Sequence, residues 1–100
     1  MAVISEVNTL STGKSEGWWI DTGATTHVAF DRGLFKTYEK VKQDCKLALG
    51  TTVTTQVIGK GKVELQFTSG KTVTLLNVLH APEMRKNLVS GFLLNKAGFE

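Results

Sequence analysis

One stretch, residues 18–28, constrains the fold of this chain more than any other. It begins with Trp18–Ile20, bulky apolar residues of the kind that form buried β-strands. The segment Asp21–Ala24 then breaks the strand, since Gly23 supplies the backbone freedom that a sharp reversal needs. Placing a carboxylate at the edge of a core is costly unless hydrogen bonds compensate it. The stretch therefore predicts a buried strand that ends in a tight turn carrying Asp21.

The composition favours an all-β domain. The chain has 100 residues, which suits one domain with a modest core. It contains ten glycines and one proline, as expected for strands joined by glycine turns rather than for a helical bundle. We expect a strand and linker over residues 1–16, with the strand at Val3–Val7 and a loop after it, and a β-barrel domain over residues 17–100.

Alternation of apolar and polar residues predicts the main strands. Lys46–Leu49 and Val53–Ile58 flank a glycine turn and describe a β-hairpin. The apolar residues of Val63–Phe67 recur at every second position, so we expect them to face inward. The adjacent Leu75 and Leu76 predict burial on both faces of their strand, which suits a central strand of a small closed barrel.

Short helical segments are expected at two places. Asp31–Phe35 resembles a helical turn that folds its last two residues onto the core, and a loop rich in charges of both signs should follow it. After an apolar strand end, Ser90 is placed to cap a C-terminal helix with Phe92–Leu94 on its core side. Gly98 is the expected end of that helix.

A carboxylate at the edge of a core is the arrangement used in aspartic proteolysis. Two adjacent carboxylates share one proton because both cannot ionise at close range, so one activates a water while the other donates to the scissile carbonyl. Only Asp21 has this setting, since Asp31 and Asp44 have the surroundings of solvated loop residues. Its partner would be Asp21 of a second identical chain. Asp-Thr-Gly is also a common turn sequence, so the triplet alone does not establish catalysis.

Other kinds of site find little support. Neither His27 nor His80 lies at metal-ligand spacing from the single cysteine, Cys45, so neither a metal nor another cofactor is expected. Residues 59–62 lack the long loop and helix start of a phosphate cradle, and their glycines should mark a bend or bulge. The net charge is +3, but the basic residues are scattered, so no direct nucleic-acid binding is expected.

The cellular setting is inferred from two absent signals. No apolar run approaches the length that spans a bilayer, and the N-terminus lacks the basic-then-apolar order of a secretion signal. We therefore expect a soluble, intracellular and cytoplasmic protein without a membrane partner.

Several motifs, in their order and spacing, resemble one known family. They cover roughly residues 17–99 and comprise Asp21–Gly23, Leu49-Gly50, Gly59–Val63 and, above all, Asn77–Ser90. Together they are similar to the protease region of copia-type LTR retrotransposon Gag-Pol polyproteins, close to the plant elements. His27, which follows the active-site turn, is also typical of that family rather than of retroviral proteases. Ser90 stands where the retroviral relatives have glycine.

The resemblance implies a small closed retropepsin-like barrel with one short C-terminal helix, acting as a homodimeric aspartic endopeptidase. Its substrate would be peptide segments of the polyprotein, within virus-like particles. The implied catalytic residues are Asp21, Thr22 and Gly23, with Thr22 linking the two catalytic loops. The implied substrate-binding residues come from the catalytic turn, a flap and the segment before the last strand: Ala24, Thr25, Thr26, Val28, Gly50, Thr51, Thr52, Met84, Arg85, Lys86 and Leu88.

A second interpretation stays open beside the enzyme. Proteases of the copia type carry further strands after the position that corresponds to Glu100, and retropepsins dimerise through interleaved chain termini. A truncated chain can fold without pairing, and it would then be an inactive or vestigial peptide-binding module. Because a fold does not transfer an activity, the two interpretations have to be separated by experiment.

Overall fold

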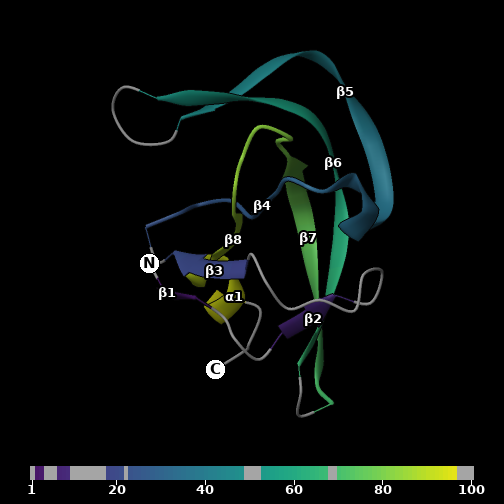
Figure 1. The fold of residues 1–100 in the computed structure, drawn as a ribbon, viewed down its shortest axis with the longest axis vertical. Coiled ribbons are helices and arrows are strands. Elements are labelled where there is room, and N and C mark those ends of the chain that lie inside the picture. The colour runs from purple at the N-terminus through teal and green to yellow at the C-terminus, as the bar shows by residue number, and fades with distance from the viewer. Residues whose placement is uncertain are drawn as a thin grey trace.

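The computed structural model describes residues 2–3, 7–9, 18–21, 23–48, 53–67 and 70–96, and every strand found in these ranges joins one β-sheet (Figure 1). The strands are β1 (Ala2–Val3), β2 (Val7–Thr9), β3 (Trp18–Asp21), β4 (Val28–Ala29), β5 (Phe35–Ala48), β6 (Thr54–Phe67), β7 (Thr72–His80) and β8 (Asn87–Ser90). A 3-10 turn, η1 (Arg32–Leu34), precedes β5, and the helix α1 (Gly91–Lys96) follows β8. The prediction of a mostly-β fold with a short C-terminal helix is confirmed.

In the described residues the sheet curls into a half-barrel. Its strand order is β1-β3-β8-β4-β7-β6-β2, and β5 pairs with β6 beside this path. No ladder within the described residues joins β1 to β2 or β5, so closure of the predicted barrel stays a prediction. The long strands β5 and β6 instead bend together as a hairpin arm over the rest of the sheet (Figure 1).

The loop predicted after η1 is wrong, because these residues belong to β5. The strand pairs with β6 from Phe35 to Ala48, with register shifts along the way. Most of its side chains are exposed, so backbone pairing rather than burial holds it in place. Asp44, predicted in a loop, lies in this strand and accepts a hydrogen bond of 2.7 Å from the Gln56 amide. A strand without a buried face shows no alternation in its sequence.

The glycines of residues 59–62 lie where β5 passes close to β6. A Cβ at Gly61 would clash with the carbonyl group of Thr37, and one at Gly59 would clash with the Tyr38 ring. The register of β6 against β7 shifts between Gly61 and Val63. The prediction that these glycines mark a bend or bulge in a strand is confirmed.

The strand β7 is not buried on both faces, contrary to the prediction. Leu75 is 2% exposed, but Leu76 is 54% exposed. Asn77 has a positive φ of 54°, which interrupts the pleat, and Val78 then returns to the core. The two buried residues are therefore three positions apart, because two residues of β7 bulge outward opposite one residue of β6.

The main core fills the concave side of the curled sheet. Val63 and Leu65 are fully buried, as the alternation predicts, and Leu34 and Phe35 fold onto the same cluster. Among the described side chains of α1 only Leu94 is buried, while Phe92 is 61% exposed, so the prediction that Phe92–Leu94 all face the core is wrong for Phe92. A six-residue helix has one narrow face, which contacts the core at a single position.

The N-terminal segment contributes two strands where one was predicted. β1 pairs antiparallel with β3, and β2 pairs antiparallel with the far end of β6. Asn8 and Thr9, predicted in a loop, belong to β2. The boundary between residues 16 and 17 stays a prediction, and Gly98 lies outside the described residues. Within the described ranges, none of the helical structure has the length and apolar character needed to cross a bilayer.

Candidate functional site

The strand β3 carries Asp21 to the edge of the core, as the sequence predicts. Trp18 at its start is fully buried, and Asp21 at its end is half-buried. β3 runs parallel to β8, with Asp21 opposite Ser90 in the last pair of the ladder. The chain then turns, since the Ala24 N–H donates to the Asp21 carbonyl at 3.2 Å and the Gly23 N–H donates to Asp21 Oδ1 at 2.9 Å. One carboxylate oxygen is therefore held by the backbone of its own turn.

Gly23 is not needed for the backbone conformation of this turn, contrary to the prediction. In the described residues only Asn77 and Gly70 have a positive φ. A Cβ built on Gly23 would meet only Asp21 Oδ1, at an ordinary contact distance of 3.5 Å. Gly23 is exposed and faces the cavity beside Asp21, so a side chain at this position would occupy the space of the cavity instead of straining the fold.

A cavity of about 490 Å³ opens beside Asp21. Ten residues that the sequence predicts for catalysis or substrate binding line it: Asp21, Gly23, Ala24, Thr25, Thr26, Val28, Met84, Arg85, Lys86 and Leu88. Thr22 and the predicted flap residues Gly50, Thr51 and Thr52 lie outside the described residues. The structure thus brings together, on one cavity, side chains that are up to 67 positions apart in the sequence, from Asp21 to Leu88.

Two lining residues, Leu47 and Ala48, were missed by sequence reasoning. Both lie at the end of β5, where the hairpin arm reaches the cavity beside the Asp21–Ala24 turn. Leu47 packs against a small cluster formed by Val28, Ala81 and Leu88. Leu47 lies in the strand that leads into the predicted flap, which was the available signal, but the direction of its side chain depends on the bend of the hairpin arm.

The wall opposite the hairpin arm is formed by the segment between β7 and β8. The Ala81 N–H donates to the Ala29 carbonyl at 2.9 Å, and the Met84 N–H donates to the Ala81 carbonyl at 3.1 Å, which folds this segment into a turn. The Lys86 ammonium lies 4.1 Å from the centre of the Trp19 ring, a cation–π contact. The described lining therefore combines one carboxylate, two basic side chains and apolar walls.

His27 is a buried residue that follows the Asp21–Ala24 turn, with 4% of its surface exposed. Its Nδ1 accepts a hydrogen bond of 3.0 Å from the Ser90 N–H, and its carbonyl accepts one of 3.0 Å from the Leu79 N–H. Burial lowers the pKa of the imidazole below its usual value because it disfavours the charged form. Sequence analysis connected His27 with the family but did not identify these contacts.

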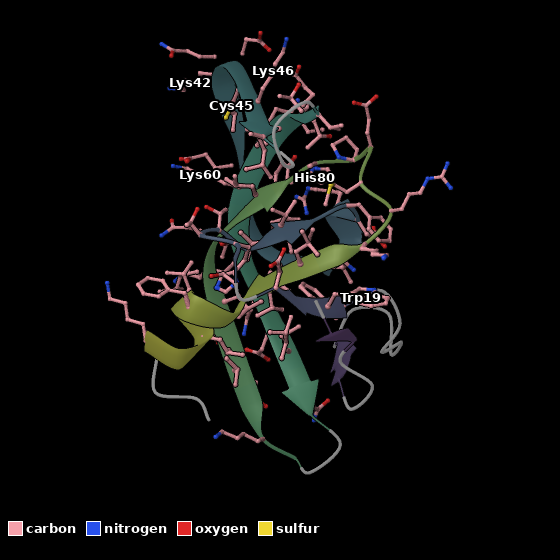
Figure 2. All side chains as sticks on the ribbon, turned by 90° about the vertical axis from the view of Figure 1, so that its left-hand side faces the viewer. Trp19, Lys42, Cys45, Lys46, Lys60 and His80 are labelled. Carbon is pink, nitrogen blue, oxygen red and sulfur yellow. The ribbon has the colours of Figure 1, made fainter. Side chains whose placement is uncertain are left out.

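His80 and Cys45 are not among the residues that line the cavity. His80 Nδ1 is 2.7 Å from the Tyr38 hydroxyl, and this contact links β7 to β5. The other ring nitrogen, Nε2, is 3.2 Å from the Phe30 carbonyl. Cys45 lies between Lys42 and Lys46 on the outer part of the hairpin arm, away from His80 (Figure 2). The part of the chain that the structure describes contains no cluster of three or more His, Cys, Asp or Glu side chains suited to a metal ion.

Comparison with known proteins gives a consistent set of matches. The family described as "Pol polyprotein, beta-barrel domain" matches residues 18–99. The chain is 34% identical over 89 residues to the retrovirus-related Pol polyprotein from transposon TNT 1-94 of Nicotiana tabacum, which covers 88% of this chain and 7% of that protein. It is 30% identical over 84 residues to a putative transposon Ty5-1 protein of Saccharomyces cerevisiae, covering 83% of this chain and 53% of that protein. No solved structure gives a significant match.

Proposed function

Because this chain belongs to the Pol polyprotein β-barrel domain family of retrotransposons, we propose that it is a retropepsin-like aspartic endopeptidase that processes such a polyprotein. The chain spans about half or less of the length of the relatives it matches, so their names carry no activity to it by themselves. The observation that supports the proposal best is a half-buried Asp21 at the end of a core strand, facing a cavity of about 490 Å³.

The proposed catalytic unit consists of Asp21 from two identical chains. Asp21 is the only carboxylate in the described lining of the cavity, whereas peptide cleavage by the aspartic-protease mechanism uses a pair of carboxylates. In the dyad one proton is shared; the charged carboxylate takes a proton from the attacking water, and the protonated one donates to the scissile carbonyl. The Gly23 N–H on Asp21 Oδ1 keeps one oxygen of each carboxylate in place. Thr22 is proposed to link the two turns.

The proposed substrate is an extended peptide segment of the polyprotein. It would lie between the hairpin arm and the floor of the catalytic turn, where Leu47, Met84 and Leu88 offer apolar contacts to its side chains. Gly50, Thr51 and Thr52 would close over it as a flap and exclude water. We propose that the enzyme works without a cofactor, in the cytoplasm and within virus-like particles, and that nucleic acid and membrane are not its partners.

The test is cleavage of a polyprotein fragment that contains the native junctions. Asp21→Asn should abolish cleavage while leaving the circular dichroism spectrum unchanged, because it removes the ionisable group without changing its size. Asp31→Asn is the matched control, since Asp31 is exposed and only caps η1. Inhibition by statine peptides is expected. Equal cleavage by the wild type and Asp21→Asn would contradict the proposal.

A second candidate function follows from the single carboxylate in the cavity. A chain that stays monomeric would be a peptide-binding module with the same cavity and no catalysis. Calorimetry with a peptide spanning a junction, together with sedimentation at increasing concentration, separates the two. Binding by a monomer without cleavage supports the module, whereas a concentration-dependent dimer with cleavage supports the enzyme.

A further inference from the structure

The catalytic turn extends beyond the sheet that carries it. The parallel ladder between β3 and β8 ends at the pair Asp21 and Ser90, so it gives the residues after Asp21 no further pairing. Two side-chain hydrogen bonds continue the connection. The Ser90 N–H donates to His27 Nδ1 at 3.0 Å, and the Ser90 hydroxyl donates to the Ala24 carbonyl at 2.6 Å. Ser90 thus reaches the turn near its beginning and at its end.

The hydrogen bond from the Ser90 N–H fixes the protonation state of the His27 ring. A backbone N–H only donates, so Nδ1 must carry a lone pair, and the proton of the neutral ring is on Nε2. An imidazolium has a proton on both nitrogens and cannot accept from Ser90. The contact is buried, where an unpaired N–H is costly. This hydrogen bond therefore exists only with neutral His27.

The Ser90 hydroxyl has two partners. It accepts from the Leu93 N–H at 3.2 Å, as the predicted cap of α1, and its one proton goes to the Ala24 carbonyl. Ser90 is fully buried, so both bonds are shielded from water. A glycine at this position would lose both side-chain bonds, whereas the N–H that binds His27 would remain.

We propose that His27 and Ser90 are positioning residues that hold the Asp21–Ala24 turn against β8, and so aim the Asp21 carboxylate into the cavity. The inference rests on the proposed protease function, because the orientation of the Asp21 carboxylate affects activity only if that carboxylate takes part in the reaction. Neither residue contacts substrate in this account. They act through the turn, which also depends on the Gly23 N–H bond to Asp21 Oδ1.

The test compares two substitutions of His27, one that keeps a hydrogen-bond acceptor for the Ser90 N–H and one that removes it. His27→Asn places the amide oxygen where Nδ1 lies and keeps an acceptor for the Ser90 N–H, whereas His27→Leu keeps apolar bulk and removes the acceptor. We expect His27→Leu to lower kcat by roughly 10- to 100-fold, since small misplacements of catalytic groups have effects of this size. KM should change by less than about threefold, because His27 itself does not line the cavity. His27→Asn should recover most of kcat.

Ser90→Ala is the second variant, used in case His27→Leu does not fold. It removes the bond to the Ala24 carbonyl but keeps the Ser90 N–H, so a smaller loss of kcat with unchanged KM is expected. Equal kcat in His27→Leu and His27→Asn, or a wild-type kcat in folded Ser90→Ala, would overturn the proposal.

A second readout does not depend on activity. Hydrogen exchange of the Gly23 and Ala24 amides reports the turn directly, because both amides donate within it. Their protection should fall in His27→Leu and be kept in His27→Asn. Unchanged protection in both variants overturns the positioning role. If the wild-type chain cleaves nothing but the amides respond as expected, the protease proposal fails while the role of His27 in the turn is supported.

Discussion

Asp21 and Ser90 face each other in the last pair of the parallel ladder between β3 and β8, the point from which the candidate catalytic turn departs. Ser90 also bonds to the Ala24 carbonyl and, through its N–H, to His27. A residue of β8 therefore connects the start and the end of the turn. This arrangement makes the orientation of the carboxylate a property of two strands and not of a flexible loop.

The first prediction concerns Gly23. Gly23→Ala should fold with a free energy of unfolding within about 1 kcal/mol of the wild type, because Gly23 does not have a positive φ and the new Cβ meets only Asp21 Oδ1 at 3.5 Å. Cleavage should nevertheless fall at least about tenfold, since the methyl group enters the cavity where the peptide is proposed to lie. Urea unfolding measures the predicted stability, and cleavage kinetics measure the predicted loss of activity. A strongly destabilised variant would contradict this account of the turn.

The second prediction concerns Gly61. Gly61→Ala should lower the free energy of unfolding by roughly 1–3 kcal/mol, because the new Cβ clashes with the Thr37 carbonyl group and forces β5 away from β6. Gly23→Ala is the matched control, with the same added methyl group and no clash. Chemical denaturation measures the difference. Equal stability of the two variants would show that the crossing of β5 and β6 is looser than described.

The third prediction is a pH dependence of stability. Burial lowers the pKa of His27 in the folded chain, whereas in the unfolded chain it stays near 6.5. The unfolded state therefore binds the proton at a higher pH, and stability contributed by neutral His27 is complete above about pH 7 and is lost as the pH falls below about 6.5. The titratable groups on the neighbouring elements are Asp21 on the turn, His80 on β7 and Lys96 on α1.

Urea unfolding between pH 5 and pH 8 measures this effect, with His27→Asn as the variant that lacks the titrating ring. The wild type should lose stability relative to His27→Asn as the pH falls. Parallel profiles would mean that His27 does not titrate differently in the two states.

The fourth prediction concerns Leu47, one of the two lining residues that the sequence did not reveal. Leu47→Ala should raise KM several-fold with a smaller change in kcat, since it removes an apolar contact from the wall but leaves the proposed catalytic turn intact. Ile58→Ala is the control, because Ile58 lies on the adjacent strand and is exposed. Steady-state cleavage of a junction peptide provides both constants. An equal effect of the two substitutions would exclude Leu47 from the binding wall.

Much of the fold was predictable where burial produces a pattern. Val63 and Leu65 follow the alternation of a strand with one buried face, and Ser90 caps its helix as its position predicts. The end of β5 was predicted as a strand, but its part before Lys46 was missed, because charged, exposed residues carry no such pattern. Leu76 was misplaced because the positive φ of Asn77 breaks the pleat, and nothing in the two adjacent leucines reveals a bulge.

The candidate site was predictable through resemblance more than through pattern. The motifs that resemble the family supplied Asp21, Met84 and Leu88, which the fold then brings to one cavity. Leu47 and the contact between His27 and Ser90 depend on the bend of the hairpin arm and on the register of β3 against β8. These contacts join segments that are far apart in the sequence, so no local pattern of residues predicts them.

The central claim is that one active site needs Asp21 from two chains, and subunit mixing tests it most directly. Wild-type and Asp21→Asn chains are equilibrated at a fixed total concentration above that needed for dimerisation, and the cleavage rate is measured against the wild-type fraction. If both carboxylates are required, an equal mixture retains about one quarter of the full rate, because random pairing makes about one quarter of the dimers wild type. A rate of about one half, falling linearly with the wild-type fraction, would contradict the shared dyad.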